Sequence, residues 1–200
     1  MKRLFFLLIA ALLVGVGTIS AQEVNSREDA KAARQAAKEA RQKAKEAEKA
    51  AAEAEEKALF EEAKAALEAQ DFVLEADRVE FKRGNWAYVT PSTNFVSLID
   101  GKATVQLAFN GAFSGPNGIG GITVEGTPSN ISLKTDKKGN VNFQMMVQGV
   151  GISASVTIRM VNGSAKCTAT VSPNFSGNRV SFTGTLYPSS ASSVYKGRAL

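Results

Sequence analysis

Hydrophobic and polar residues alternate with a period of two along most of the chain after Phe72. In segment 102–109, apolar residues occupy the odd positions, and Lys102, Thr104 and Gln106 lie between them. Segments 141–147, 152–160 and 180–186 repeat this alternation. Successive side chains of a strand point to opposite faces of a sheet. The pattern therefore predicts antiparallel strands with one apolar face and one wet face of threonine, serine, asparagine and glutamine.

Turn residues separate these segments. Asp100-Gly101 and Asn162-Gly163 predict two-residue type I′ hairpins, because both central positions of that turn require a positive φ. Segment 136–140 predicts a longer hairpin, and 149–151 predicts another tight reversal. Eight or nine such strands indicate a mainly β domain, an antiparallel meandering barrel or half-barrel of the lipocalin-like kind. A sandwich is the alternative.

The chain before Phe72 has a different character. No glycine or proline occurs between Thr18 and Arg83, and residues 26–70 are almost entirely strong helix formers. Ser26 to Asp29 resembles a capping box. We therefore expect one long N-terminal α-helix, with a charged alanine-rich spacer over 22–57. An apolar stripe in 58–70 should dock this helix on the β domain, residues 71–200.

The alanines of this helix recur in alternating steps of three and four, which is the period of a coiled-coil seam. The pattern favours either self-association through this seam or a solvated spacer helix without a partner. The seam consists of Ala30, Ala33, Ala37, Ala40, Ala44, Ala47, Ala51, Ala54 and Ala58.

The first 21 residues have the organisation of a signal peptide. Lys2 and Arg3 precede an apolar run over 4–16, which is shorter than the roughly 20 residues needed to span a bilayer. We expect cleavage near Ala21 and a periplasmic or secreted mature chain without a transmembrane span; an uncleaved anchor is the alternative. No cysteine near this junction offers a lipid attachment site.

Composition restricts the chemistry. The sequence has no histidine and a single cysteine, Cys167, so His-dependent triads, His-ligated zinc and thiolate clusters are excluded. Cys167 follows the alternation as a buried thiol. No phosphate-binding glycine motif occurs, and the basic residues are scattered, which disfavours nucleic acid. We expect no cofactor, no metal and no catalysis, with Glu75 and Asp77 as the carboxylate pair of an alternative hydrolase.

The region most typical of a ligand site is the glycine-rich segment 113–121, whose backbone amides could meet a ligand. Asn94-Phe95 after Pro91 is a second rim candidate, and Trp86 with Tyr88 is a third. The predicted ligand-binding residues are Phe95, Phe113, Asn117, Gly118, Gly120 and Gly121.

Four short motifs resemble an exported bacterial family labelled domain of unknown function 4251. They are FVLEADR at 72–78, NFV at 94–96, GIGG at 118–121 and VSFTG at 180–184. The resemblance covers about residues 58–197 and implies a compact β-rich fold, no assigned activity and no catalytic residues. The chain differs from lipid-anchored members because it lacks a lipobox cysteine.

These patterns together favour a non-catalytic binding module of the cell envelope, with its ligand at the open end of the β domain. A structural protein that oligomerises through the alanine-rich helix is the second hypothesis.

Overall fold

A computed structural model describes residues 26–109, 116 and 118–199 of this protein, with side chains of the helix described from Arg34 onward. The predicted signal peptide, Phe113 and Asn117 lie outside these residues. The described residues divide into two compact units, with the boundary between Glu46 and Ala47.

Helix α1 extends over Ser26–Ala69, as the helix-forming composition predicts. The described seam alanines, from Ala37 to Ala58, are exposed, and self-association stays a prediction. The helix ends at Ala69, and the next residue, Gln70, adopts a left-handed φ of 57°. Asp71 N donates to Ala66 O (3.0 Å) and Gln70 N to Leu67 O (3.2 Å), the two bonds of a Schellman motif. This motif turns the chain directly into β1.

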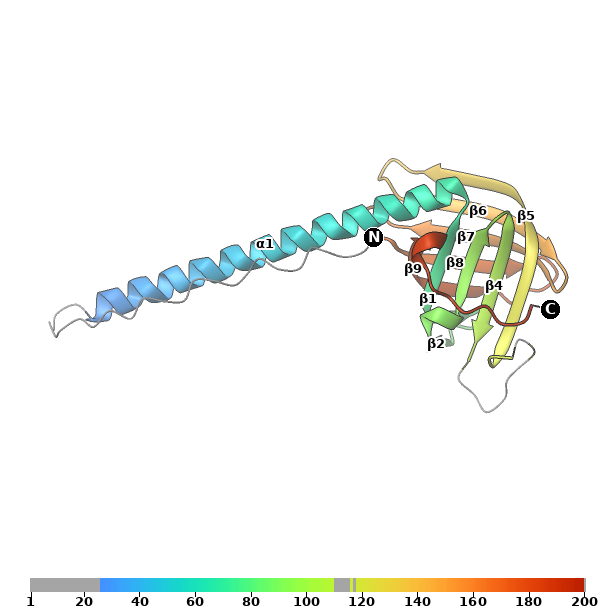
Figure 1. Cartoon of the computed structure of the whole chain (residues 1–200), viewed down its shortest axis with the longest axis horizontal. Helices are drawn as coiled ribbons and strands as arrows, with labels where there is room; N and C mark the ends of the chain where they lie inside the picture. The colour runs from blue at the N-terminus through green and yellow to red at the C-terminus, as the bar shows by residue number, and fades with distance from the viewer. Residues whose placement is uncertain (1–25, 110–115, 117, 200) are drawn as a thin grey trace. The chain divides into compact units, whose positions relative to one another are not determined.

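In the described part of the chain, nine antiparallel strands follow, and eight of them close into a barrel (Figure 1). Each strand of the barrel pairs with its neighbours along the chain, and β1 pairs with β9 to close the wall, while β2 pairs with β1 alone. The predicted barrel is confirmed and the sandwich alternative is wrong. The strands are β1 (Phe72–Phe81), β2 (Trp86–Tyr88), β3 (Phe95–Ile99), β4 (Lys102–Ala108), β5 (Gly121–Thr135), β6 (Val141–Gly149), β7 (Ile152–Met160), β8 (Lys166–Pro173) and β9 (Val180–Pro188), with 3-10 helices η1 (Pro91–Thr93) and η2 (Ser189–Ala191).

This topology sorts the connections between strands into two ends. The proximal end is where β1 begins, and it holds the turns at 100–101, 136–140 and 161–165. The distal end is where β1 ends, and it holds the connections 82–85, 150–151 and 174–179 together with the end of β4 and the start of β5.

The inward faces of the strands form one hydrophobic core. Phe72 and Phe143 meet edge to face with ring centroids 5.3 Å apart, and Phe182 is also buried. The last turns of α1 add Phe60, Ala63, Ala66 and Leu67 to the same cluster. Burying side chains such as Phe60 and Leu67 is worth about 1.5–3 kcal/mol each, which holds this part of the helix on the barrel.

The C-terminal strap, residues 189–199, crosses the outer face of the barrel from β1 towards β5 (Figure 1). Ser192 Oγ donates to Glu75 Oε1 on β1 (2.6 Å), and Lys196 Nζ lies 2.7 Å from Glu125 Oε1 on β5. Between them, the Gln106 amide donates to Tyr195 O (2.7 Å) and accepts from Gly197 N (2.8 Å). The strap therefore supplies polar partners along its length.

Under the strap and η1, the outer face of β3, β4 and β5 is not wet as the alternation predicts. Five polar residues are buried there: Asn94, Ser97, Thr104, Gln106 and Thr123. Gln106 satisfies its amide completely, because Thr93 O also accepts from Nε2 (2.9 Å) and Thr123 Oγ1 donates to Oε1 (2.8 Å). The prediction of a wet outer face fails here because the C-terminal strap, whose sequence has no strand or helix periodicity, covers these polar side chains.

The turns follow their sequences with one exception. Asp100 and Gly101 both have positive φ, 51° and 70°, as a type I′ hairpin requires. The type I′ prediction for Asn162-Gly163 is wrong, because only Gly163 has a positive φ and the connection extends over 161–165. The Asn162 side chain instead donates to Lys138 O (3.0 Å) and joins two neighbouring turns.

Barrel closure leaves no room for a side chain at Gly184. A Cβ added there would lie 1.9 Å from Glu75 O across the β1–β9 ladder. We predict that Gly184→Ala lowers the free energy of unfolding by roughly 3 kcal/mol, because backbone must move to relieve the overlap. Urea unfolding followed by circular dichroism measures the loss. The matched variant Ser181→Ala on the same strand should cost less than about 1 kcal/mol, and an equal effect of both variants would contradict the closure argument.

The ion pair between strap and β5 predicts a pH-dependent stability. The hydrogen bond from Lys196 is the main cause that lowers the pKa of Glu125 below its ordinary value of 4.5. A carboxylate with a lowered folded pKa stabilises the protein above its unfolded pKa, and this contribution is lost as pH falls through the folded pKa. Glu125→Gln should therefore lower the melting temperature at pH 7 by at most about 3 °C, since this pair is partly exposed. The difference from wild type should shrink as the pH falls below 4.5 and Glu125 becomes protonated; a difference that stays constant throughout the acid range would refute the assignment.

Candidate functional site

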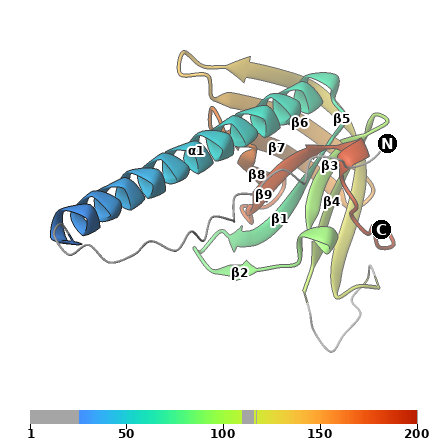
Figure 2. The same ribbon diagram turned by 60° about the vertical axis from the view of Figure 1, so that its left-hand side comes forward.

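The barrel wall is interrupted near its distal end. β1 pairs with β3 up to Glu75↔Phe95 and with β2 from Arg78↔Tyr88 onward. A β-bulge lies between these two ladders, at Asp77, whose carbonyl accepts from Val89 N (2.9 Å). Residues 89–94, which include η1, therefore leave the wall before the chain re-enters it as β3, while β2 stays beside β1 (Figure 2).

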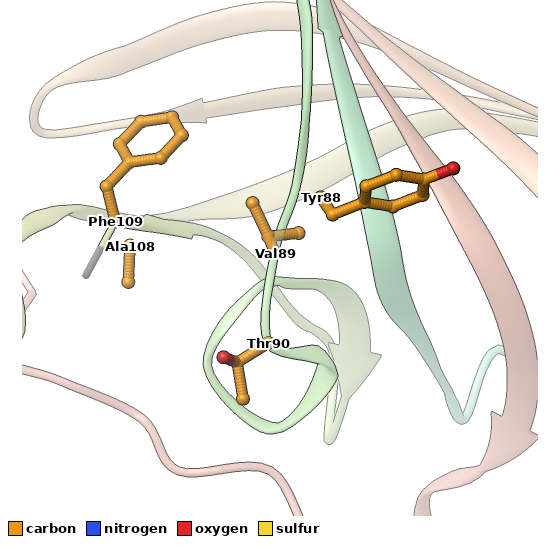
Figure 3. Close-up of a pocket in the computed structure, with 5 residues that line it drawn as sticks. All are labelled: Tyr88, Val89, Thr90, Ala108 and Phe109. Atoms are coloured by element: carbon orange, nitrogen blue, oxygen red, sulfur yellow. The ribbon is translucent and has the colours of Figure 1, made fainter.

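A pocket of about 410 Å³ lies at this interruption, between the end of β2 and the end of β4. Figure 3 shows Ala108 and Phe109 on one side and Val89 and Thr90 on the other, with the Tyr88 ring directed away from Phe109. Phe109 also approaches Phe81 of β1, with ring centroids 6.1 Å apart. The lining offers apolar surface and the Thr90 hydroxyl group, whereas the Tyr88 hydroxyl group is directed away from Phe109. None of the five described lining residues is charged.

Asn94 connects the two sides of the pocket. This residue is fully buried, and its Oδ1 accepts from Ala108 N (2.7 Å). Its Nδ2 donates to Thr90 O (3.0 Å) and to Thr93 Oγ1 (3.3 Å). One side chain therefore ties both sides of the pocket, the segment after β2 and the end of β4, at a fixed separation.

The predicted site residues have different positions. Phe95 is 1% exposed on the outer face of β3, opposite Gln106, and is not among the residues that line the pocket. Gly118 and Gly120 have positive φ, and Gly120 O accepts from Phe109 N (3.1 Å). Gly121 allows close pairing with β4, because a Cβ there would lie 1.9 Å from Leu107 O.

The third rim candidate lies nearest the pocket. Tyr88 is 77% exposed and lines it, and the Trp86 ring contacts Tyr88 edge to face at 5.0 Å. Sequence reasoning missed Val89, Thr90, Ala108 and Phe109 as lining residues. The one signal for them was the break in alternation at Thr90-Pro91, which marks where a strand is interrupted.

The groups considered for catalysis are separate from this pocket. Glu75 accepts a hydrogen bond from the strap and Asp77 lies exposed at the bulge, and neither lines the pocket. Cys167 is buried, which confirms the predicted buried thiol, and this burial raises the pKa of the thiol far above its ordinary range. Within the described residues no three histidine, cysteine or acidic side chains form a metal-binding group, and no helix is apolar enough to cross a bilayer.

We predict that Asn94→Ala opens the pocket frame and destabilises the protein by about 2–3 kcal/mol, because it leaves the buried Ala108 amide without an acceptor. Amide hydrogen exchange should show faster exchange at Ala108 than in the wild type. Asn174→Ala, which removes an exposed hydrogen bond to Ser153, should change stability by less than about 1 kcal/mol. Unaltered exchange at Ala108 in Asn94→Ala would show that this side chain does not hold the frame.

Comparisons with known proteins agree with the architecture. The model of the family described as domain of unknown function DUF4251 matches residues 54–186. A crystal structure of a DUF4251 family protein from Bacteroides eggerthii DSM 20697 is 47% identical, with a TM-score of 0.61, and the match covers 74% of this chain and 99% of that chain. The comparison with curated proteins finds no match. The family resemblance predicted from the four short motifs is confirmed, and this chain belongs to the DUF4251 family.

Proposed function

We propose that this protein is a non-catalytic, exported binding protein of the cell envelope, and that it holds a small ligand in the pocket between β2 and β4. The observation that carries this proposal is the coincidence of the pocket with the interruption of the barrel wall. The export part rests on the signal-like residues 1–21.

The lining indicates the class of ligand. A volume of about 410 Å³ is that of a small-molecule site. Phe109, Val89 and Ala108 favour an apolar face, while the Thr90 hydroxyl group can pair with hydroxyl or carbonyl groups. Because none of the described lining residues is charged, we infer a neutral ligand, such as a sugar ring, a small aromatic molecule or a short peptide.

The arrangement supports binding without catalysis. General acid–base chemistry requires a titratable group within hydrogen-bond reach of the reacting atoms. Among the described lining residues, Tyr88 alone carries a titratable group, and its ring is directed away from Phe109. The carboxylates of Glu75 and Asp77 are not part of this lining.

Nuclear magnetic resonance with neutral probes tests the proposal. Methyl glucoside, indole and an N-acetylated dipeptide amide would each be titrated into the ¹⁵N-labelled protein. We expect amide shifts from at least one probe to cluster at residues 88–90 and 108–109. Shifts that are absent for all three probes, or that cluster elsewhere, would remove this pocket as the binding site.

A pair of phenylalanine variants provides the control. Phe109→Ala should weaken binding about tenfold, because it removes the main aromatic surface of the pocket. Phe175→Ala removes an aromatic ring that is 91% exposed in another distal connection and should leave the affinity unchanged. Melting temperatures of both variants separate lost binding from lost folding.

A further inference from the structure

We propose that the distal end of the barrel, formed by connections 82–85, 150–151 and 174–179 with the adjoining Trp86, docks on the surface of an anionic lipid bilayer. The proposal goes beyond the small-ligand pocket and does not depend on it.

Large apolar side chains are exposed at the tips of this end. Phe175 is 91% exposed in the β8–β9 connection, Val150 is 78% exposed in the β6–β7 turn, and Trp86 is 55% exposed where β2 begins. Each of the three connections thus carries or adjoins one such side chain. Isolated exposed apolar residues are ordinary on protein surfaces, so these three side chains carry the argument only together with the charge beside them.

Positive charge accompanies these residues. Lys82, Arg83 and Arg179 are exposed and surround a second pocket, of about 380 Å³, together with Asn85 and Asn178. None of the ion pairs found among the described residues involves these three cations. Cationic groups and amides around one hollow match the oxygens of a phosphate headgroup.

Negative charge is missing from the same connections. Segments 81–86, 149–152 and 173–180 contain no aspartate or glutamate. The nearest carboxylate along the chain is Glu80, which lies exposed on β1 opposite Trp86, and the three cations outnumber it. The sign of the field at the tips is therefore set by the three cations, and it is complementary to anionic lipid.

The meander places these features on one arc. β1, β9, β8, β7 and β6 are successive neighbours around the wall, so their distal connections follow one another along the rim. We would expect a protein partner to bind a continuous apolar surface. Separate apolar side chains with cations between them can instead each insert into a lipid bilayer, because the bilayer surface is fluid. Tryptophan is favoured at the boundary of headgroups and acyl chains, and lysine and arginine bind its anionic lipids.

The proximal end supplies an internal comparison. Its turns also carry cations, Lys137 and Lys138, and one exposed apolar residue, Val161 (66% exposed). These turns contain Asp100 and Asp136 as well, and Asp136 accepts hydrogen bonds from its own hairpin. Basic charge alone is thus present at both ends, but only the distal connections combine it with aromatic tips and no acid.

Vesicle binding tests the proposal directly, because Trp86 is the only tryptophan of the chain. The chain from Gln22 onward would be used, since it keeps every described residue and omits the apolar run 4–16. With vesicles of phosphatidylglycerol and phosphatidylethanolamine, we expect cosedimentation and a shift of Trp86 emission to shorter wavelength. Vesicles of phosphatidylcholine should bind far less, and added salt should weaken binding to the anionic ones.

Matched variants identify the docking end. Replacing Lys82, Arg83 and Arg179 by glutamine should weaken vesicle binding about a hundredfold, at roughly fivefold per charge. Replacing Phe175 and Val150 by serine should abolish the emission shift or reduce it strongly. The control variant with Lys137→Gln, Lys138→Gln and Val161→Ser at the proximal end should bind vesicles like the wild type.

Several results would overturn the docking proposal. One is binding without an emission shift, which would indicate that α1 or another surface meets the lipid. Another is equal loss in the proximal and distal variants, and a third is no binding to anionic vesicles. Glycerol 3-phosphate should leave the emission unchanged; a shift with this soluble anion equal to that with vesicles would indicate a site for a free phosphate. The neutral-probe titration is independent of all these outcomes, so either proposal can fail alone.

Discussion

The backbone pairing of β1 is the constraint on which the rest of the barrel depends. This strand closes the wall with β9 along its whole length while its other edge serves β3 first and β2 afterwards. A single straight strand cannot pair in register with β3 and then with β2 along the same edge. The bulge at Asp77 allows β1 to change from one partner to the other. The close approach at Gly184 and the interruption of the wall at residues 89–94 both follow from it. The neutral pocket is therefore a consequence of how the barrel closes.

Polar burial outside the barrel is the second consequence of that interruption. Where the chain leaves the wall, Asn94 replaces ladder hydrogen bonds with side-chain bonds to both edges. Gln106 likewise forms side-chain hydrogen bonds to the strap, and every donor and acceptor of its amide has a partner. A buried amide without these partners would cost about 1–3 kcal/mol, so each residue requires the segment that covers it. The outer face is thus a second, polar layer of the fold with a specific cover.

Most of the fold could be predicted from local pattern, because β4, β6, β7 and β9 have one apolar face each and need no other information. Prediction failed where tertiary contacts decide. β5 was not recognised as one 15-residue strand, since Pro128 and the positive φ of Asn130 accompany a register shift within it. Gln106 was assigned to water because the strap that covers it has no periodicity of its own. In the site, the aromatic rim at Trp86 and Tyr88 could be predicted from composition. Val89 and Ala108 could not, because only the break in the wall turns them towards a common space.

The meander also explains why exposed aromatic and cationic side chains gather at one end. Connections alternate between the ends, so each end collects residues that are distant in sequence but have the same orientation to the barrel. At the proximal end the last turns of α1 bury apolar surface, and the turns there pair their polar groups with one another, as Asn162 does with Lys138. The distal connections have no such cover among the described residues, and they keep aromatic and cationic side chains exposed. Exposed apolar area has a free-energy cost in water, and docking these side chains on a bilayer would remove that cost. The neutral pocket between β2 and β4 lies on the side wall instead. The two proposed sites can therefore be occupied at once, and a bilayer at the distal end would bring the pocket close to the membrane surface.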